Sequence, residues 1–255
     1  MALTACILTF NEEKNLPDCL ASIAWADEVL VVDSHSTDRT VEIAGARGAR
    51  VVPRAWEGMN KQREFAIREA RHDWVLCLDA DERVSPELRE EVQAAVARQD
   101  GVAGYEVPRH TWYLGRWIDH GGWYPDLKLR LFRREKARTV GKDPHDRIEV
   151  DGPVGRLKGE IHHYTYRCFS QQIGTIDRFS EAASKELFEA GERFRVWKLL
   201  LRPPLKFLEC WVWKLGLLDG LPGLVIAVAS AFNVFSRYVK LWEKERGLAE
   251  GGPRP

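Results

Sequence analysis

Apolar residues recur in four short runs along the first part of the chain, at 5–10, 28–33, 50–53 and 73–79. Each run is nearly continuous and does not alternate between apolar and polar positions, as expected of strands that are covered on both faces. Segments of helical character separate the runs. This order predicts an α/β fold in which helices lie on both faces of a mostly parallel sheet.

Capping and turn residues set the boundaries of the predicted helices. Asn15 and Pro17 predict a helix start after the first run, because Asn caps helices and Pro suits the first helical turn. Further helices are predicted at 36–49, 59–71 and 85–99. Strands and helices therefore alternate up to about this point, as they do in open α/β sheets.

The pattern changes after residue 104. The segments 104–117, 127–134 and 150–166 interleave aromatic and basic residues and predict strands or hairpins. After Cys168 the chain is helical in character, with predicted helices at 169–190, 203–218 and 222–246. We expect an α/β domain at 1–166 and a C-terminal helical region at 167–255.

Charge and cysteine content narrow the class of protein. Lys+Arg and Asp+Glu both number 38, and this balance argues against a general nucleic-acid-binding protein. The five cysteines form no CxxC pair, so neither a zinc ribbon nor a disulfide framework is predicted. The N-terminal segment lacks a basic region and is interpreted as a strand, not as a signal peptide. A reducing cytoplasm is the simplest compartment.

Acidic residues follow three of the predicted strands. Thr9 and Glu12 follow the first, Asp33 ends the second, and Asp79 and Asp81 end the fourth. Ligands of open α/β sheets bind at the carboxyl ends of strands, and carboxylates gathered there require a cation or several donors. Mg²⁺ or Mn²⁺ is usually held by one or two carboxylates together with phosphate oxygens. The alternative for the Asp-Ala-Asp triplet is an exposed turn ahead of a helix.

Residues Asp79 and Asp81 are two positions apart, so in an extended segment they point the same way. One can take a metal ion while the other takes a ribose hydroxyl. The chain has no G-x-G-x-x-G after the first strand, no P-loop and no G-x-S-x-G elbow. The pattern therefore favours a nucleotide diphosphate site without a glycine-rich loop.

Four motifs in order carry a family resemblance. The segments ILTFNEEKNLPDCLASI, VLVVDSHSTDRTVEIA, NKQREFAI and WVLCLDADERV resemble family 2 glycosyltransferases with the GT-A fold, a Rossmann-like α/β fold, over roughly the first 165 residues. The continuation, with WYPDLKLRLFRR and the helical tail, resembles lipopolysaccharide core β-glucosyltransferases of Gram-negative bacteria. The resemblance implies transfer of a hexose, with glucose favoured, from a UDP-sugar to a lipid-linked saccharide, namely an inner-core heptose.

The same resemblance implies a role for residues spread over the motifs. Binding of the nucleotide sugar is implied for Thr9, Glu12, Asp33, Lys61 or Arg63, and Asp79. Arg130 is added from the local pattern, since Arg130 and Arg133 alternate with apolar residues and can line one wall near the phosphates, the alternative being an ordinary strand with a solvated face. Metal binding, with Mg²⁺ or Mn²⁺ as the cofactor, is implied for Asp81 and His163. The alternative for Lys61 and Arg63 is a solvated helix face, and for His163 it is packing beside His162.

The resemblance also implies inversion at the anomeric carbon, which needs a base to take the acceptor proton. Asp146 is the first candidate, because family members place an acidic residue after the LFRR strand, and Asp126 is the second.

Two rival interpretations of the function of the protein remain open. A sugar-nucleotide pyrophosphorylase would need a glycine-rich loop where TFNEE stands, and a non-catalytic membrane-surface scaffold would keep the fold without the chemistry. A glycosyltransferase acting on another polysaccharide or lipid carrier is a further alternative.

The C-terminal region is basic in a chain that is neutral. Between 193 and 246 there are ten basic and four acidic residues, interleaved with Trp and Leu. The uncharged stretch 221–236 is shorter than the ~20 apolar residues of a spanning helix. We therefore expect peripheral attachment to the cytoplasmic face of the inner membrane through 196–242. The alternative is that these helices pack on the sheet or form a homo-oligomer interface.

Overall fold

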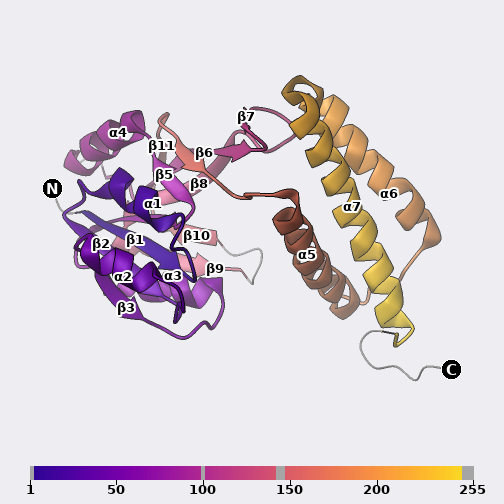
Figure 1. Cartoon of the computed structure of the whole chain (residues 1–255), viewed down its shortest axis with the longest axis horizontal. Helices are drawn as coiled ribbons and strands as arrows, with labels where there is room; N and C mark the ends of the chain where they lie inside the picture. The colour runs from indigo at the N-terminus through magenta and orange to yellow at the C-terminus, as the bar shows by residue number, and fades with distance from the viewer. Residues whose placement is uncertain (1–2, 99–100, 142–146, 249–255) are drawn as a thin grey trace. The chain divides into compact units, whose positions relative to one another are not determined.

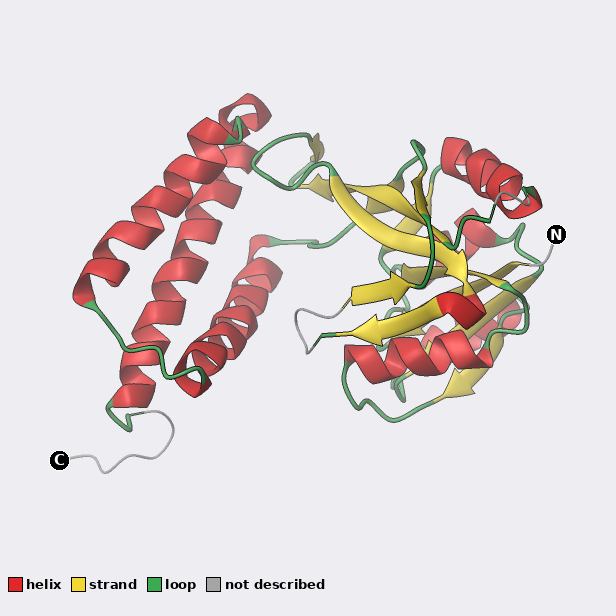
Figure 2. Cartoon of the chain, turned by 180° about the vertical axis from the view of Figure 1, so that it is seen from behind, coloured by secondary structure: helices red, strands yellow, loops and turns green. Residues whose placement is uncertain are grey.

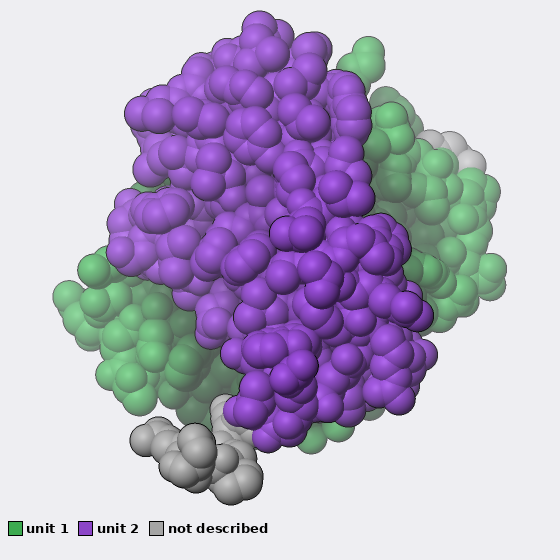
Figure 3. Space-filling model, turned by 90° about the vertical axis from the view of Figure 1, so that its right-hand side faces the viewer, with its two compact units in different colours: residues 1–110, 125–164 green, residues 111–124, 165–255 purple. Residues whose placement is uncertain are grey.

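The computed structural model describes residues 3–98, 101–141 and 147–248 of the 255. The chain forms two compact units, which Figure 3 colours separately. Unit 1 comprises 1–110 and 125–164, and unit 2 comprises 111–124 and 165–255. The segment 111–124, which the sequence analysis assigned to the first domain, thus belongs with the C-terminal helices.

Unit 1 contains a sheet in which helices alternate with strands along the first part of the chain (Figure 1). The strands β3, β2, β1 and β4 lie side by side in that order and are parallel. Their bounds, and those of the helices, are β1 Leu3–Thr9, α1 Leu16–Ile23, β2 Glu28–Asp33, α2 Thr40–Ala46, β3 Arg50–Pro53, α3 Met59–Glu69, β4 Trp74–Asp79 and α4 Pro86–Ala97. The predicted α/β class is confirmed.

Both faces of this parallel region are buried. In β1, Ala5 and Ile7 pack in one apolar cluster with α1, α2 and α4, whereas Cys6 and Leu8 pack in a second cluster with α3. Successive side chains of a strand point to opposite faces. A strand with a core on each side must therefore be apolar at every position, which explains the continuous runs in the sequence.

The remaining strands make the sheet mixed. Strand β8 runs antiparallel to β4 and to β6, and β12 runs antiparallel to β5. A separate two-stranded hairpin is formed by β9 and β10. The bounds are β5 Glu82–Val84, β6 Gly104–Tyr113, β7 Arg116–Ile118, β8 Asp126–Arg133, β9 Ala137–Val140, β10 Arg147–Val150, β11 Val154–Arg156 and β12 Ile161–His163, with a short 3₁₀ turn at Arg134–Lys136.

Unit 2 is mainly helical (Figure 2). Its long helices are α5 Phe169–Glu189, α6 Val196–Leu208 and α7 Gly220–Glu245, with a π-helical turn η2 at Glu209–Trp213 and a 3₁₀ turn η3 at Gly216–Asp219 between the last two. Helix α7 packs against both α5 and α6. The predicted start of the second helix at residue 203 was wrong, because α6 begins at Val196 and contains Pro203 and Pro204 in its interior.

Within the described residues, one helical segment, Gly216–Glu245, is long and apolar enough to cross a membrane by length and composition alone. The sequence analysis expected the uncharged stretch 221–236 to be too short to span a membrane. By length and composition of the whole helical segment, that expectation was wrong. A third of its most apolar window is buried within the protein, and core helices of soluble proteins meet the same criterion. The segment is thus weak support for a membrane span.

Candidate active site

The loops after β1 and β2 are tied together at the carboxyl ends of these strands. The buried Asp33 carboxylate accepts a hydrogen bond from the Thr9 hydroxyl at 2.9 Å. It also accepts from the backbone N–H and the hydroxyl of Ser36, at 2.8 and 2.6 Å. Two of these bonds end on Oδ1 and one on Oδ2, so Oδ2 keeps capacity for one more donor. Thr9 and Asp33 therefore meet where both were predicted.

The loop that contains Glu12 is held by a second set of bonds. Asn11 has a left-handed backbone (φ 57°), which Asn tolerates better than most residues, and its amide oxygen accepts from the Thr37 N–H at 2.8 Å. The Glu12 backbone N–H donates to the Thr40 hydroxyl at 2.8 Å. The Glu12 carboxylate accepts from Asn15 at 2.8 Å, just ahead of α1. In this structure, Glu12 therefore supports the loop between β1 and α1.

The carboxylate of Asp79, at the end of β4, lies between two arginines. Arg130 Nη2 of β8 is 2.8 Å from Asp79 Oδ2, and Arg63 Nη2 of α3 is 3.6 Å from Oδ1. The preceding residue of α3, Gln62, is buried and donates to the Ser34 hydroxyl at 2.8 Å. The NKQR motif thus anchors α3 beside β2 through Gln62 and directs Arg63 to Asp79.

Glu82 extends this arrangement into the interior. Its fully buried carboxylate lies 2.6 Å from Arg130 Nη2 and 3.4 Å from Arg109 Nη1. Arg109 in turn donates from Nε and Nη2 to Asp126 Oδ2, at 3.0 and 2.6 Å. We call this alternation of Asp79, Arg130, Glu82, Arg109 and Asp126 the charge row. It joins β4, β5, β8 and β6, so each buried charge has an opposite charge beside it.

Basic neighbours lower the pKa of two carboxylates of the charge row, Asp79 and Asp126. Burial opposes ionisation of Asp79, but Arg130 and Arg63 outweigh burial and hold its pKa well below the usual range. Burial likewise opposes ionisation of Asp126, yet Arg109 and Lys128 lower its pKa. A carboxylate with a lowered pKa accepts a proton poorly. The ion pairs of Asp126 therefore weigh against it as the catalytic base.

Asp81 and His163 meet beside the charge row. The antiparallel pairing of β5 with β12 places His163 opposite Glu82, one residue after Asp81. His163 Nε2 lies 3.3 Å from Asp81 Oδ2, and the Asp81 carbonyl accepts from the Tyr164 N–H at 2.9 Å. The two residues predicted to bind metal are thus adjacent, although more than eighty positions separate them in the sequence.

This pair fits a divalent cation that takes most of its ligands from elsewhere. Among the described residues there is no group of three or more His, Cys, Asp or Glu side chains that could hold a metal ion. The Asp79 carboxylate is occupied by two arginines, so Asp81 and His163 remain the candidate protein ligands. Mg²⁺ is commonly bound by one or two carboxylates, substrate phosphate oxygens and water. Such a site would be completed by a diphosphate.

Two predicted residues take no part in the described cluster. The Lys61 side chain is 62% exposed on α3, with its Nζ 3.6 Å from Glu57, so Arg63 is the member of the pair that reaches Asp79. Asp146, the first candidate for the base, lies outside the described residues. Its role stays a prediction.

Glu82 and Arg109 were missed by the sequence analysis. Glu82 directly follows the Asp-Ala-Asp triplet, and the sequence analysis gave it no role. One signal was available, since Glu82 and Val84 alternate with Arg83 in a short strand and therefore share a face. Both are buried, whereas Arg83 is not. Arg109 carried no local signal, because it meets Asp126 only through the pairing of β6 with β8.

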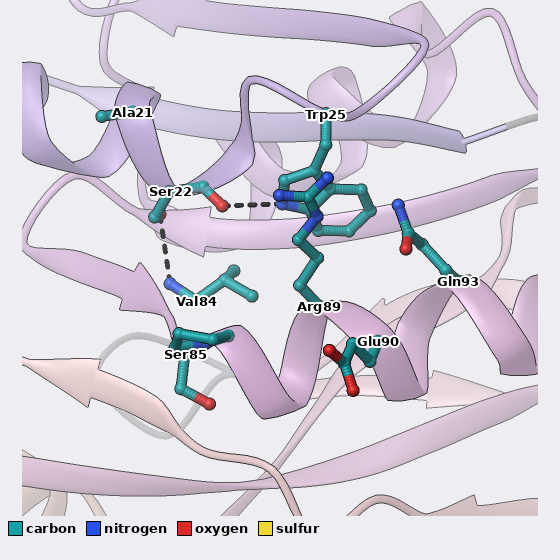
Figure 4. Close-up of a pocket in the computed structure, with 9 residues that line it drawn as sticks. Ala21, Ser22, Trp25, Val84, Ser85, Arg89, Glu90 and Gln93 are labelled. Atoms are coloured by element: carbon teal, nitrogen blue, oxygen red, sulfur yellow. Dashed lines mark hydrogen bonds between the residues drawn. The ribbon is translucent and has the colours of Figure 1, made fainter.

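A hollow of about 360 Å³ opens elsewhere on unit 1 (Figure 4). Trp25, Arg89, Glu90 and Gln93 lie along it, and Arg89 stacks 5.8 Å from the Trp25 ring. Neither member of the Asp81–His163 pair nor any residue of the charge row lines it. The strand ends, and not this hollow, therefore form the candidate active site.

Comparison with known proteins identifies the class that this fold and site define. The model of glycosyl transferase family 2 matches residues 4–151, more than half of the chain. The chain therefore belongs to this family and is a glycosyltransferase. The predicted family membership is confirmed.

Similarity to individual proteins extends over the C-terminal region as well. The chain is 29% identical to the lipopolysaccharide core biosynthesis glycosyltransferase LpsC of Rhizobium meliloti, over 93% of each chain. It is 31% identical to an uncharacterized glycosyltransferase of Rickettsia typhi, over 93% of this chain and 85% of that one. The expected resemblance to lipopolysaccharide core transferases is thus confirmed at the level of sequence similarity.

Solved structures support the fold. Mannosyl-3-phosphoglycerate synthase from Rubrobacter xylanophilus aligns with a TM-score of 0.51 and 17% identity, over 75% of each chain. Residues 1–349 of S. aureus TarS, solved in complex with UDP-GlcNAc, align with a TM-score of 0.50 and 15% identity, over 97% of this chain and 92% of that one. At these identities the likeness concerns the fold alone.

Proposed function

We propose that this protein transfers a hexose, with glucose as the favoured sugar, from a UDP-sugar to a lipid-linked saccharide, and does so with inversion. The observation that carries the proposal is the adjacency of the Asp81–His163 pair and the arginine-flanked Asp79 at the carboxyl ends of the strands. Carboxylate and imidazole ligands for a cation, with basic side chains beside them, suit the binding of a diphosphate and its metal. The similarity to LpsC supports a lipopolysaccharide core saccharide, namely its heptose, as the acceptor.

In this mechanism Asp81 and His163 would hold Mg²⁺ or Mn²⁺, which when bound neutralises charge that develops on the departing diphosphate. Asp79 would accept a hydrogen bond from ribose, and Arg63 would lie near the phosphates. An acceptor hydroxyl oxygen bonds to the anomeric carbon while the bond from that carbon to the diphosphate oxygen breaks. UDP leaves with the electron pair, and the hydroxyl proton passes to a carboxylate, for which Asp146 is our candidate.

We also propose that unit 2 attaches the enzyme to the cytoplasmic face of the inner membrane. Helix α6 has no buried residue, and its apolar side chains include Trp197 and Leu201, which are more than half exposed. Exposed tryptophan and leucine beside basic residues suit the interface of an anionic membrane. A lipid-linked acceptor would be presented at that surface.

The test is a transfer assay with the full chain, a panel of nucleotide sugars and a lipopolysaccharide core acceptor that ends at the inner-core heptose. We expect product from one UDP-hexose, with release of UDP, in the presence of Mn²⁺ or Mg²⁺. Full activity in excess chelator would contradict metal dependence. UDP binding without transfer or hydrolysis of any sugar nucleotide would instead support a scaffold without catalysis.

A further inference from the structure

A groove of about 600 Å³ lies on unit 2, lined by residues of α6, η2 and α7. Two kinds of side chain line it. Trp197, Leu201 and Trp213 are apolar and more than half exposed. Arg202 and Arg237 are basic. A groove with an apolar exposed rim and a cationic lining suits a ligand that has an apolar part and an anionic part.

The positive charge of the groove is only partly balanced by the protein, since Glu192 interacts with Arg202 at longer range. Glu209 lines the groove, but its carboxylate is already paired with Lys206 at 3.0 Å and with Lys214 at 2.6 Å. Within the described ranges, neither Arg202 nor Arg237 forms an ion pair with a carboxylate. The groove is therefore electropositive as the protein presents it.

Arg237 gives the groove a specific polar group. Its Nε is buried and has no hydrogen-bond partner among the described residues. A guanidinium is well suited to donate to phosphate oxygens, and Arg237 lines the groove from α7. Arg202, in the second turn of α6, lies with its guanidinium 6.0 Å from the ring of Tyr238, the neighbour of Arg237. Two guanidinium groups thus approach the same groove from α6 and α7.

The apolar surface beside the arginines indicates a lipid and not a soluble anion. Leu201 and Leu205 are 55% and 50% exposed, on a helix that has no buried residue. An apolar surface of this kind is stabilised when acyl chains cover it. Tryptophan prefers the boundary between acyl chains and headgroups, and Trp197 and Trp213 stand at the rim.

We infer that this groove binds the phosphate of an anionic lipid, with Arg202 and Arg237 donating to the phosphate oxygens and Leu201 and Leu205 contacting the acyl chains. The inference rests on the proposed membrane attachment and makes it specific, because one lipid headgroup would occupy a defined site. It would place unit 2 at the membrane by a fixed contact in addition to general electrostatic attraction.

The experiment measures sedimentation of the full chain with vesicles of phosphatidylcholine, alone or mixed with phosphatidylglycerol. The groove variant is Arg202→Gln with Arg237→Gln. The matched control is Arg178→Gln with Lys185→Gln, which removes two exposed positive charges from α5. We expect the groove variant to lose affinity for the mixed vesicles by about tenfold more than the control, since that factor corresponds to about one charge-assisted hydrogen bond.

A second measurement separates the groove from the membrane. Short-chain phosphatidylglycerol, kept monomeric, should raise the melting temperature of the wild-type chain and of the control but not of the groove variant. Inorganic phosphate should not reproduce the rise, and if it does, a free anion and not a lipid is the ligand. Circular dichroism of each variant checks that it is folded.

The outcomes distinguish the two proposals. Equal weakening of the groove variant and the control would overturn the groove and leave membrane attachment in place. A groove-dependent thermal shift without sedimentation would support the groove and overturn membrane attachment. Neither sedimentation nor a thermal shift would overturn both, whereas the transfer assay in solution would still test the glycosyltransferase proposal.

Discussion

The guanidinium of Arg130 lies 2.6 Å from the carboxylate of Glu82, and both side chains are almost completely buried. The same nitrogen lies 2.8 Å from Asp79, so one arginine bridges a residue of the candidate nucleotide-sugar site to a residue of the interior. Charges inside a protein are expensive unless they are paired and hydrogen-bonded. The charge row therefore holds Asp79 in place through Arg130, which is itself held by the buried Glu82.

Glu82→Gln should destabilise the protein. The substitution removes the negative charge between Arg130 and Arg109, and breaking a buried pair costs about 3–5 kcal/mol in the free energy of unfolding. Urea unfolding of the full chain measures the change. The control is Glu106→Gln, whose partially exposed pair with Arg156 at 3.3 Å should contribute less than about 1 kcal/mol. Equal losses in the two variants would mean that the charge row stabilises the protein no more than an exposed ion pair does.

Asp79 should make folding stability depend on pH at the acid end. Its folded pKa is held below the unfolded value, so the unfolded state binds more protons in the interval between them. The stabilisation is complete above the unfolded pKa of about 3.9 and is lost as the pH falls through the folded pKa. The stability difference between wild type and Asp79→Asn should therefore be greatest near neutral pH and shrink below about pH 4. A difference that stays constant across this range would contradict the assignment.

Asp81→Asn should remove metal-dependent binding of UDP and lower transfer by about a hundredfold or more, because a bound cation supplies several kcal/mol of charge stabilisation. His163→Gln should weaken metal binding in the same direction. Titration calorimetry with UDP, with and without Mn²⁺, measures the effect. Asp18→Asn is the control, since Asp18 is 70% exposed and pairs with Arg83 outside the cluster. Unchanged metal-dependent binding in Asp81→Asn would refute the metal role.

The variants of the two candidate catalytic bases, Asp146 and Asp126, should differ in kcat. Asp146→Asn should bind the UDP-sugar with metal normally but lower kcat by about 10²–10⁴-fold, because only proton removal is lost. Asp126→Asn should have the smaller effect on kcat, since its carboxylate is neutralised by Arg109 and Lys128. Steady-state kinetics with saturating donor decides between them. If Asp126→Asn shows the large loss and Asp146→Asn does not, the assignment is reversed.

The sequence alone determined the order of strands and helices in the first part of the chain. Apolar side chains at every position of β1 and β4 require a core on each face, and no other common arrangement satisfies that pattern. The motifs around Asp33 and Asp79 could also be identified from the sequence, because the apolar runs show where the strands end and both residues stand at those ends. Family membership followed from the order of four such motifs.

Only the tertiary structure decided which charges meet. The antiparallel pairing of β6 with β8 brings Arg109 to Asp126, and the pairing of β8 with β4 brings Arg130 toward Asp79, and no local pattern specifies either pairing. The start of α6 was misplaced for a related reason. Proline inside a helix costs about 3 kcal/mol, so the local rule put the start at Pro203. In the folded chain α6 begins at Val196, and Leu199 packs against the buried residues of α7, a contact between distant segments that favours continuation through the prolines.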